Sequence, residues 1–264
     1  MTTLCPQCRN PNVPGSRFCC SCGATLGATM VQNRTVLMSR TTTQGSTVVG
    51  AGTLSVTRTT SIGRSQRPHG PGGSWVASQP EDLFVVSDVS PSMEEELDPG
   101  VTKFVSAIRA GISLTLSKSQ IDGRDRMGII PFDERAEVAH PLSSVGTEKA
   151  RLIQTLQSLT VGNGTDLNAG LVEADGAFDW NRNDVVRRIV LLTDGHGGSP
   201  EKTAASLRQR GVVLDVIGFG HDPSDVNEEL LRSIATPSHY RFIKDHRTLV
   251  QHYTQLANKT QVGR

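Results

Sequence analysis

Three oxygen-bearing side chains stand at alternate positions in the stretch DLFVVSDVSPS, residues 82–92. They are Asp88, Ser90 and Ser92, and they follow a short apolar run at 83–86. A run of this kind that ends in a polar loop is typical of a central parallel strand. Oxygen side chains that turn toward one point are the ligands that hard divalent cations prefer. The stretch therefore predicts a cation site just beyond a strand, the alternative being ordinary loop and capping residues around a metal-free sheet.

Two later segments add polar side chains at comparable places. Thr165 lies in Gly164-Thr165-Asp166, between a glycine-rich loop and an amphipathic run, and Asp194 follows a second apolar run at 189–192. In an open α/β sheet, ligands bind outside the carboxyl ends of the strands. We therefore expect Asp88, Thr165 and Asp194 to meet at one rim of the sheet.

This combination resembles the von Willebrand factor A (vWA) domain, over about residues 81 to 264. In that family a metal-ion-dependent adhesion site (MIDAS) consists of Asp-x-Ser-x-Ser, a distant Thr and a distant Asp. The resemblance assigns these roles to five residues of this chain: Asp88, Ser90, Ser92, Thr165 and Asp194. The one departure is Pro91 between the serines, where family members often have a small residue; proline fixes φ but removes no side-chain ligand.

The resemblance also implies how the site works. Ser90 and Ser92 would bind the ion directly, Thr165 would join when a ligand is engaged, and the two aspartates would act directly or through water. A carboxylate of a partner protein would complete the coordination. The hydroxyl-rich ligand set favours Mg²⁺ over Ca²⁺, with Mn²⁺ as another option.

A catalytic role would require more than the metal. A metal-dependent hydrolase needs a general base within reach of the water that the ion activates. His196, two residues beyond Asp194, is the only obvious candidate. We therefore expect an interaction module and not an enzyme.

All five cysteines fall within the first 22 residues. Two CxxC pairs separated by ten residues can place four thiolates around one Zn²⁺. The segment resembles the short zinc ribbon that opens many prokaryotic multidomain proteins, with Cys5, Cys8, Cys19 and Cys22 as ligands and Cys20 left over. Reactive or disulfide-linked cysteines are the alternative.

Residues 28–80 are rich in Thr, Ser, Gly and Arg, and we expect a flexible linker there. Thr53 and Thr59 each precede an aliphatic residue by three positions, which resembles phosphothreonine sequences recognised by forkhead-associated domains. Phosphate would add nearly two negative charges to a basic arm. Nucleic-acid binding by the arginines is the weaker alternative, because the arm lacks lysine and offers few aromatic rings for stacking.

Charge is divided unevenly along the chain. Residues before Glu81 contain seven arginines, no lysine and no acidic residue, so the remainder carries 20 basic against 26 acidic residues. The start of the sequence has no basic segment followed by an apolar one, and no stretch approaches the length of a transmembrane helix. From these features we expect a cytoplasmic protein.

Strands and helices alternate from Glu81 onward. This predicts an α/β fold: a doubly wound, mostly parallel, Rossmann-like sheet with one antiparallel edge strand. Strands are expected at 83–86, 126–132, 137–141 (the antiparallel edge), 188–193, 212–218 and 240–243. Helices are expected from Asp98-Pro99, from Thr147, and at 167–178, 200–211, 228–235 and 248–259.

The sequence thus predicts a zinc ribbon at 1–27, a linker at 28–80 and a vWA domain at 81–264. The predicted function is that of a metal-dependent adaptor that works beside threonine kinases, phosphatases or forkhead-associated proteins. The alternative is an accessory subunit of a ring-forming AAA+ ATPase of the MoxR or magnesium-chelatase type.

Overall fold

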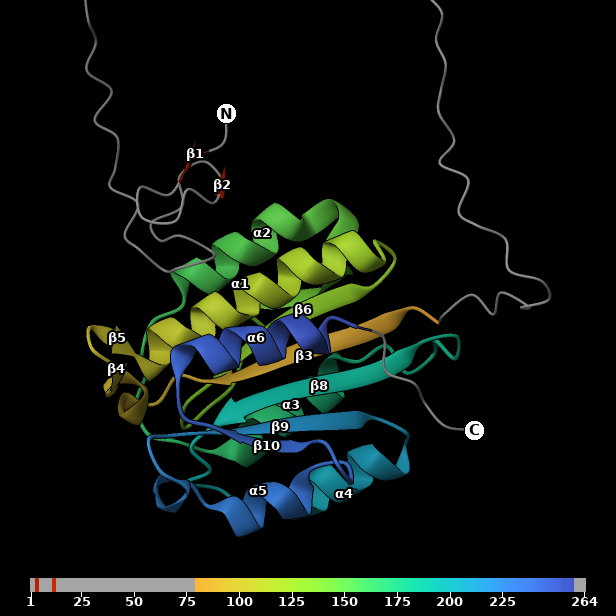
Figure 1. The fold of residues 1–264 in the computed structure, drawn as a ribbon. Coiled ribbons are helices and arrows are strands. Elements are labelled where there is room, and N and C mark those ends of the chain that lie inside the picture. Colours follow the sequence, from red (N-terminus) through yellow and green to blue (C-terminus); the bar gives the residue numbers. More distant parts are fainter. Residues whose placement is uncertain (1–2, 5–10, 13–78, 259–264) are drawn as a thin grey trace, which may run out of the picture. The chain divides into compact units, whose positions relative to one another are not determined.

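The computed structural model describes residues 3–4, 11–12 and 79–258, and the account of the fold concerns 79–258. Six strands form one sheet (Figure 1): β3 (Glu81–Asp88), β6 (Arg126–Phe132), β7 (His140–Ser144), β8 (Val186–Thr193), β9 (Val213–Phe219) and β10 (Tyr240–Ile243). Six α-helices pack on it: α1 (Lys103–Ile121), α2 (Val145–Ser158), α3 (Leu167–Ala177), α4 (Glu201–Gln209), α5 (Glu228–Ile234) and α6 (His246–Leu256). Short pairs of strands also form between β1 (Thr3–Leu4) and β2 (Pro11–Asn12), and between β4 (Glu96–Asp98) and β5 (Val101–Thr102).

The sheet has the strand order β10-β9-β8-β3-β6-β7. All neighbours are parallel except β6 and β7, so β7 is the antiparallel edge strand. The predicted fold class is therefore confirmed. Strand β3 lies in the interior of the sheet and hydrogen-bonds to β6 on one side and β8 on the other.

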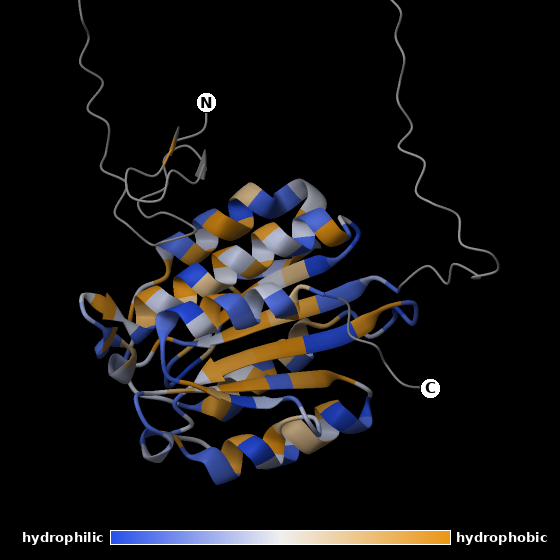
Figure 2. Ribbon diagram, in the orientation of Figure 1, coloured by the Kyte–Doolittle hydropathy of each residue, from blue (hydrophilic) through white to orange (hydrophobic). Residues whose placement is uncertain are grey.

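Each face of the sheet is covered by three helices. Successive residues of β3 alternate between the faces: Leu83 and Val85 pack in the core formed with α1, α2 and α6, while Phe84 and Val86 pack in the core formed with α3, α4 and α5. Because both faces are buried, the central strands are apolar over most of their length, as Figure 2 shows for β8 and β9. No helix in the described part of the chain is long and apolar enough to cross a membrane.

The structure corrects three predicted boundaries. The first helix does not begin at Asp98-Pro99: those residues belong to the β4–β5 hairpin, where Pro99 and Gly100 form the turn and Gly100 has a φ of +74°. Helix α1 begins after Thr102, whose hydroxyl accepts a hydrogen bond from the Val105 amide.

The other two corrections concern the edge strand and the start of α2. The edge strand runs over β7 and not 137–141, and α2 begins at Val145, before the predicted cap Thr147. Helix α5 begins at Glu228, as predicted; its cap is Asn227, while Asp225 forms a capping box with Asp222.

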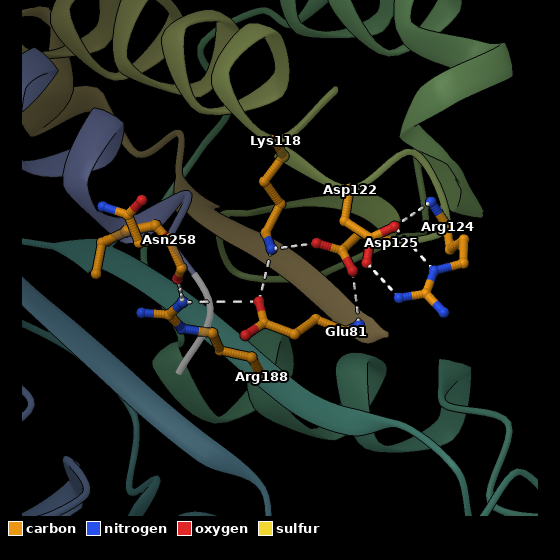
Figure 3. Close-up of polar contacts among 8 residues, drawn as sticks. Glu81, Lys118, Asp122, Arg124, Asp125, Arg188 and Asn258 are labelled. Atoms are coloured by element: carbon orange, nitrogen blue, oxygen red, sulfur yellow. Dashed lines mark hydrogen bonds and ion pairs between the residues drawn. The ribbon is translucent and has the colours of Figure 1, made fainter. Parts of the chain in front are cut away.

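The amino ends of the central strands carry buried ion pairs (Figure 3). The Lys118 ammonium of α1 lies 2.6 Å from a Glu81 carboxylate oxygen and 2.8 Å from one of Asp125, and all three side chains are buried. On β8, Arg188 pairs with Asp215 and donates to the carbonyl of Leu256 at 2.8 Å. These contacts hold α1, the central strands and the end of α6 together at the amino ends of the strands, and the predicted metal site lies at the carboxyl ends.

Candidate metal centre

Asp88 is the last residue of β3, and its carboxylate is fully buried. One carboxylate oxygen accepts from the Ser90 amide at 2.8 Å, and the other accepts from the Thr193 hydroxyl at 2.7 Å. Thr193 ends the neighbouring strand β8, so Asp88 is held by its own loop and by the adjacent strand. These contacts fix the orientation of the carboxylate before any ligand binds.

The two serines connect Asp88 to Asp194. Their hydroxyl oxygens lie 3.0 Å apart, and the Ser92 hydroxyl donates to an Asp194 carboxylate oxygen at 2.5 Å. Since Ser92 has a single hydroxyl proton, Ser90 is the donor in the bond between the serines. Four of the five predicted ligands, Asp88, Ser90, Ser92 and Asp194, therefore lie in one hydrogen-bonded cluster.

Asp194 immediately follows β8 and is itself held by backbone contacts. Its second carboxylate oxygen accepts from the His196 amide at 3.3 Å, and its carbonyl accepts from the Asn227 amide at 3.2 Å. The carboxyl ends of β3 and β8 are thus joined through side chains as well as through the sheet. This is the rim at which an open α/β sheet binds ligands.

Thr165 lies in the loop that leads into α3. That loop is fastened to the Asp88 loop by a hydrogen bond from the Gly162 amide to the Val89 carbonyl, at 2.7 Å. On its other side, a Cβ atom added to Gly197 would lie 2.1 Å from the Thr165 carbonyl oxygen, so the two backbones pass very close. Within residues 79–258, no hydrogen bond joins the Thr165 hydroxyl to the other four residues. The structure therefore brings Thr165 to the same rim without joining it to the cluster.

The electrostatic state of the cluster follows from its burial. Burial, together with a smaller contribution from the charge of Asp194, raises the pKa of Asp88 to about 6, against the opposing effect of the hydrogen bonds from Ser90 and Thr193. The negative charge of Asp194 thus disfavours the charged form of the buried Asp88 carboxyl. A bound cation would offset this repulsion.

The donor set fits a hard divalent cation. It consists only of oxygen atoms, two carboxylates and three hydroxyls, as Mg²⁺ prefers. The described residues contain no cluster of three or more His, Cys, Asp or Glu side chains that could hold a metal ion. Any ion at this rim would therefore depend on the hydroxyls of Ser90, Ser92 and Thr165 beside Asp88 and Asp194.

Thr193 holds the Asp88 carboxylate in place, a contact that the sequence did not reveal. Its hydroxyl donates to Asp88 and accepts from the Gly195 amide at 2.9 Å, so it orients one carboxylate and the turn beyond the other. The only signal was its position directly before Asp194 at the end of an apolar strand. A strand-end threonine is too common for that signal to be decisive.

His196 does not point freely into the cluster. Its Nε2 atom lies 3.0 Å from the carbonyl oxygen of Asp225, and since a carbonyl can only accept, Nε2 carries the proton and donates it. The imidazole is therefore held against the loop before α5.

Other predicted site residues lie outside the described residues. These are the thiolates Cys5, Cys8, Cys19 and Cys22, and the threonines Thr53 and Thr59. They remain predictions.

Known proteins resemble this chain in sequence and in fold. The family profile of the von Willebrand factor type A domain matches residues 82–259. The uncharacterized protein YwmC of Bacillus subtilis is 25% identical over 158 residues, which cover 55% of this chain and 69% of YwmC. A mouse protein named for sushi, von Willebrand factor type A, EGF and pentraxin domains is 25% identical over 136 residues, but these cover only 4% of that protein.

Solved structures share the fold at low sequence identity. The vWF domain of the pilus tip protein Mfa5 from Porphyromonas gingivalis gives a TM-score of 0.60 at 13% identity, over 70% of this chain and 99% of that one. BatB from Bacteroides thetaiotaomicron gives 0.56 at 19% identity, over 66% and 96% of the two chains. Proximal thread matrix protein 1 from the mussel byssus, described with a zinc-occupied MIDAS motif, gives 0.55 at 20% identity, over 68% of this chain and 48% of that one.

The profile match spans the whole sheet, from the start of β3 to the end of α6, and includes Asp88, Thr165 and Asp194. The chain belongs to the von Willebrand factor type A domain family, whose members are metal-dependent adhesion and protein-interaction modules.

Proposed function

We propose that this protein is a non-enzymatic adaptor that binds a carboxylate of a partner protein through a divalent cation, with Mg²⁺ favoured. The observation that carries the proposal is the hydrogen-bonded cluster of Asp88, Ser90, Ser92 and Asp194 at the carboxyl ends of β3 and β8. These side chains come from two parts of the chain that lie 102 positions apart, and the contacts between them are hydrogen bonds between polar groups.

The chemistry of the donors favours recognition of an acidic partner. Three of the five predicted ligands are neutral hydroxyls, so only Asp88 and Asp194 supply negative charge, and together they at most balance the two positive charges of the ion. Direct coordination by only some of these groups would leave the ion electrophilic and with coordination positions open. A carboxylate is the protein side chain best suited to fill such a position.

The position of His196 argues against a hydrolase. A general base must reach the water that it deprotonates, whereas the His196 ring is held by its Nε2–H on the Asp225 carbonyl, and within residues 79–258 it makes no hydrogen bond to the side chains of the cluster. Asp88 and Asp194 are the other titratable groups at the cluster, and both are assigned to the ion. The site therefore supports binding better than proton transfer.

We extend the proposal to the whole chain. A zinc ribbon of Cys5, Cys8, Cys19 and Cys22 would add a second, structural metal, and the arm that carries Thr53 and Thr59 would be the substrate of a threonine kinase. The partner would then be a kinase, a phosphatase or a forkhead-associated protein in the cytoplasm. An AAA+ ATPase whose loop offers the carboxylate is the second candidate.

The test is an affinity pull-down from native lysate in Mg²⁺, with wild type, Asp88→Ala and Asp184→Ala. Asp184 is a matched control because its side chain is 73% exposed and precedes β8 at the amino end. A partner that wild type and Asp184→Ala retain, and that Asp88→Ala or EDTA removes, supports the metal bridge. A partner captured equally by all three, and in EDTA, contradicts it, provided that circular dichroism shows Asp88→Ala to be folded.

The identity of the retained partner, together with phosphate mapping, separates the two versions of the adaptor. Phosphate on Thr53 or Thr59 after co-expression with a kinase supports the signalling version. An unmodified arm together with a captured ATPase supports the second candidate.

A further inference from the structure

A groove of about 490 Å³ lies directly beside the predicted metal site. Val89, one of its lining residues, stands between Asp88 and Ser90 in the loop that carries the predicted ligands. The rest of the lining comes from the end of β6, the segment between β6 and β7, the end of α2 and the loop that leads to Thr165. The groove therefore adjoins the position at which a partner carboxylate would arrive.

The groove combines an apolar surface with charged residues. Its apolar lining consists of Val89, Pro131, Ala136, Ala139 and Leu159. Its charged lining consists of Asp133, Arg135 and Glu137, a net charge of −1. An apolar surface beside carboxylates suits a side chain that has an aliphatic stem and a cationic head.

Asp133 is held in place as an anion. Its two carboxylate oxygens accept from the amides of Arg135, at 2.8 Å, and Asn163, at 2.9 Å. These backbone hydrogen bonds lower the pKa of the carboxyl below its usual value, so the group is charged at neutral pH. Because Asn163 belongs to the Thr165 loop, Asp133 connects the groove to a loop that carries a predicted ligand.

Glu137, unlike Asp133, is not held by hydrogen bonds to the backbone of the described residues. Its side chain is exposed, and within residues 79–258 it takes part in no hydrogen bond or ion pair. It is free to turn toward a ligand in the groove. An anionic ligand would meet two carboxylates here, and a purely apolar one would cover them without compensation.

We propose that the groove holds a lysine or arginine side chain of the same partner segment whose carboxylate binds the cation. The stem would lie against Val89, Ala136 and Leu159, and the head would meet Asp133 and Glu137. The inference rests on the proposed function and adds to it: the partner motif is an acidic residue with a basic residue a few positions away.

Synthetic peptides test this without knowledge of the partner. Twelve-residue Gly/Ser peptides would carry one Glu alone, or one Glu with Arg or norleucine placed two to five positions away on either side. Each peptide is titrated at millimolar concentration into ¹⁵N-labelled full-length protein, in Mg²⁺ and in EDTA. The amides of Ala136, Ala139 and Leu159 report on the groove, and those of Ser92 and Gly195 report on the metal loops.

We expect the best Glu/Arg peptide to bind at least about threefold more tightly than its norleucine counterpart, as a solvent-exposed ion pair allows. The difference should disappear in Glu137→Gln and in Ser158→Trp, which places a bulky ring at the exposed end of α2 beside the groove. Glu96→Gln, an exposed carboxylate on β4 outside the groove, should leave the difference unchanged.

The outcomes separate this inference from the proposed function. Binding that requires Mg²⁺ but shows no preference for Arg, or a preference that survives both groove variants, overturns the groove and leaves the metal bridge intact. An Arg preference that persists in EDTA and in Asp88→Ala contradicts the metal bridge and leaves the groove. Absence of binding by every peptide contradicts both.

Discussion

Ser92 and Asp194 are separated by 102 positions in the chain, yet the Ser92 hydroxyl donates to the Asp194 carboxylate at 2.5 Å. This one bond joins the loop after β3 to the loop after β8. It also places a neutral donor against a carboxylate in a partly buried position, where Asp88 is close enough to add repulsion. Such an arrangement is better explained as a prepared cation site than as a device for stability.

Mg²⁺ should therefore stabilise the wild-type protein, and Asp194→Asn should remove this response. A ligand at 100 times its dissociation constant stabilises the native state by about 2.7 kcal/mol, which for a domain of this size raises Tm by roughly 5–10 °C. The measurement is thermal unfolding in EDTA and in increasing Mg²⁺. Asp184→Asn, an equal change of charge at an exposed position before β8, should retain the full rise. A rise that survives in Asp194→Asn would place the ion elsewhere.

Gly197→Ala should disturb the site without removing any predicted ligand. The residue has a φ of +93°, and its added Cβ would lie 2.1 Å from the Thr165 carbonyl oxygen. We expect a loss of roughly 2–4 kcal/mol in the free energy of unfolding, together with weaker Mg²⁺ binding, because the Thr165 loop must move.

Gly211→Ala provides the matched control for this variant. Gly211 has a similar φ of +82°, but nothing lies within 4 Å of its added Cβ. It should lose only about 1–2 kcal/mol for the left-handed backbone, and its Mg²⁺ affinity should equal that of the wild type. Equal Mg²⁺ affinity in Gly197→Ala would show that the position of the Thr165 loop does not matter for the ion.

The sequence predicted most of the sheet well because its interior strands are buried on both faces. Arg126–Phe132, an apolar interior strand, was placed at its observed bounds, and so was the half-exposed edge strand Tyr240–Ile243. The start of α1 was wrong because Asp98-Pro99 suits a helix start and a hairpin turn equally well. The pairing of β4 with β5 decides between them.

Only some residues of the candidate site could be identified from the sequence. Asp88 and Asp194 were recognisable because each follows an apolar strand, and Ser90 and Ser92 because of their spacing. The contacts of Thr193 and Asp133 could not be recognised, because each joins segments that are distant in sequence. Thr193 contacts Asp88, and Asp133 contacts Asn163. Single-sequence patterns carry no information on such pairs.

The predicted zinc ribbon can be tested by the zinc content of the protein. Elemental analysis of the purified chain should find one zinc per molecule, and Cys5→Ser should remove it, since a structural site needs all four of its ligands. Cys20→Ser, a change of the one cysteine outside the predicted set, should keep the zinc. Zinc retained in Cys5→Ser, or lost in Cys20→Ser, would show that the ligand set is wrong.

Acid should weaken the packing of α6 through His252. Burial, together with the charge of Arg241, lowers the pKa of this imidazole to about 4, and the Arg241 guanidinium donates to its Nδ1 at 3.1 Å. The unfolded state, with a pKa of about 6.5, binds more protons between these values, so stability is lost as pH falls from 6.5 toward 4. Because the side chain is only partly buried, we expect about 1 kcal/mol by pH 5.

The comparison of wild type with His252→Gln isolates this contribution. The variant should show a smaller fall in the free energy of urea unfolding between pH 7 and pH 5. His221→Gln, a change at an exposed imidazole, should follow the wild-type profile. Identical pH profiles for wild type and His252→Gln would contradict the assignment.

Lys118→Met should be the most destabilising of these substitutions. It removes the buried cation that lies 2.6 Å from Glu81 and 2.8 Å from Asp125, and leaves two buried carboxylates facing each other. Arg188, at 3.8 Å from Glu81, compensates only in part. Breaking a buried pair in this way costs about 3–5 kcal/mol, measurable by urea unfolding.

Arg151→Met removes a side chain that is 77% exposed and paired at 3.2 Å with Glu148, and should cost less than about 0.5 kcal/mol. Similar losses in both variants would mean that the buried cluster at the amino ends of the strands does not hold the sheet and α1 together.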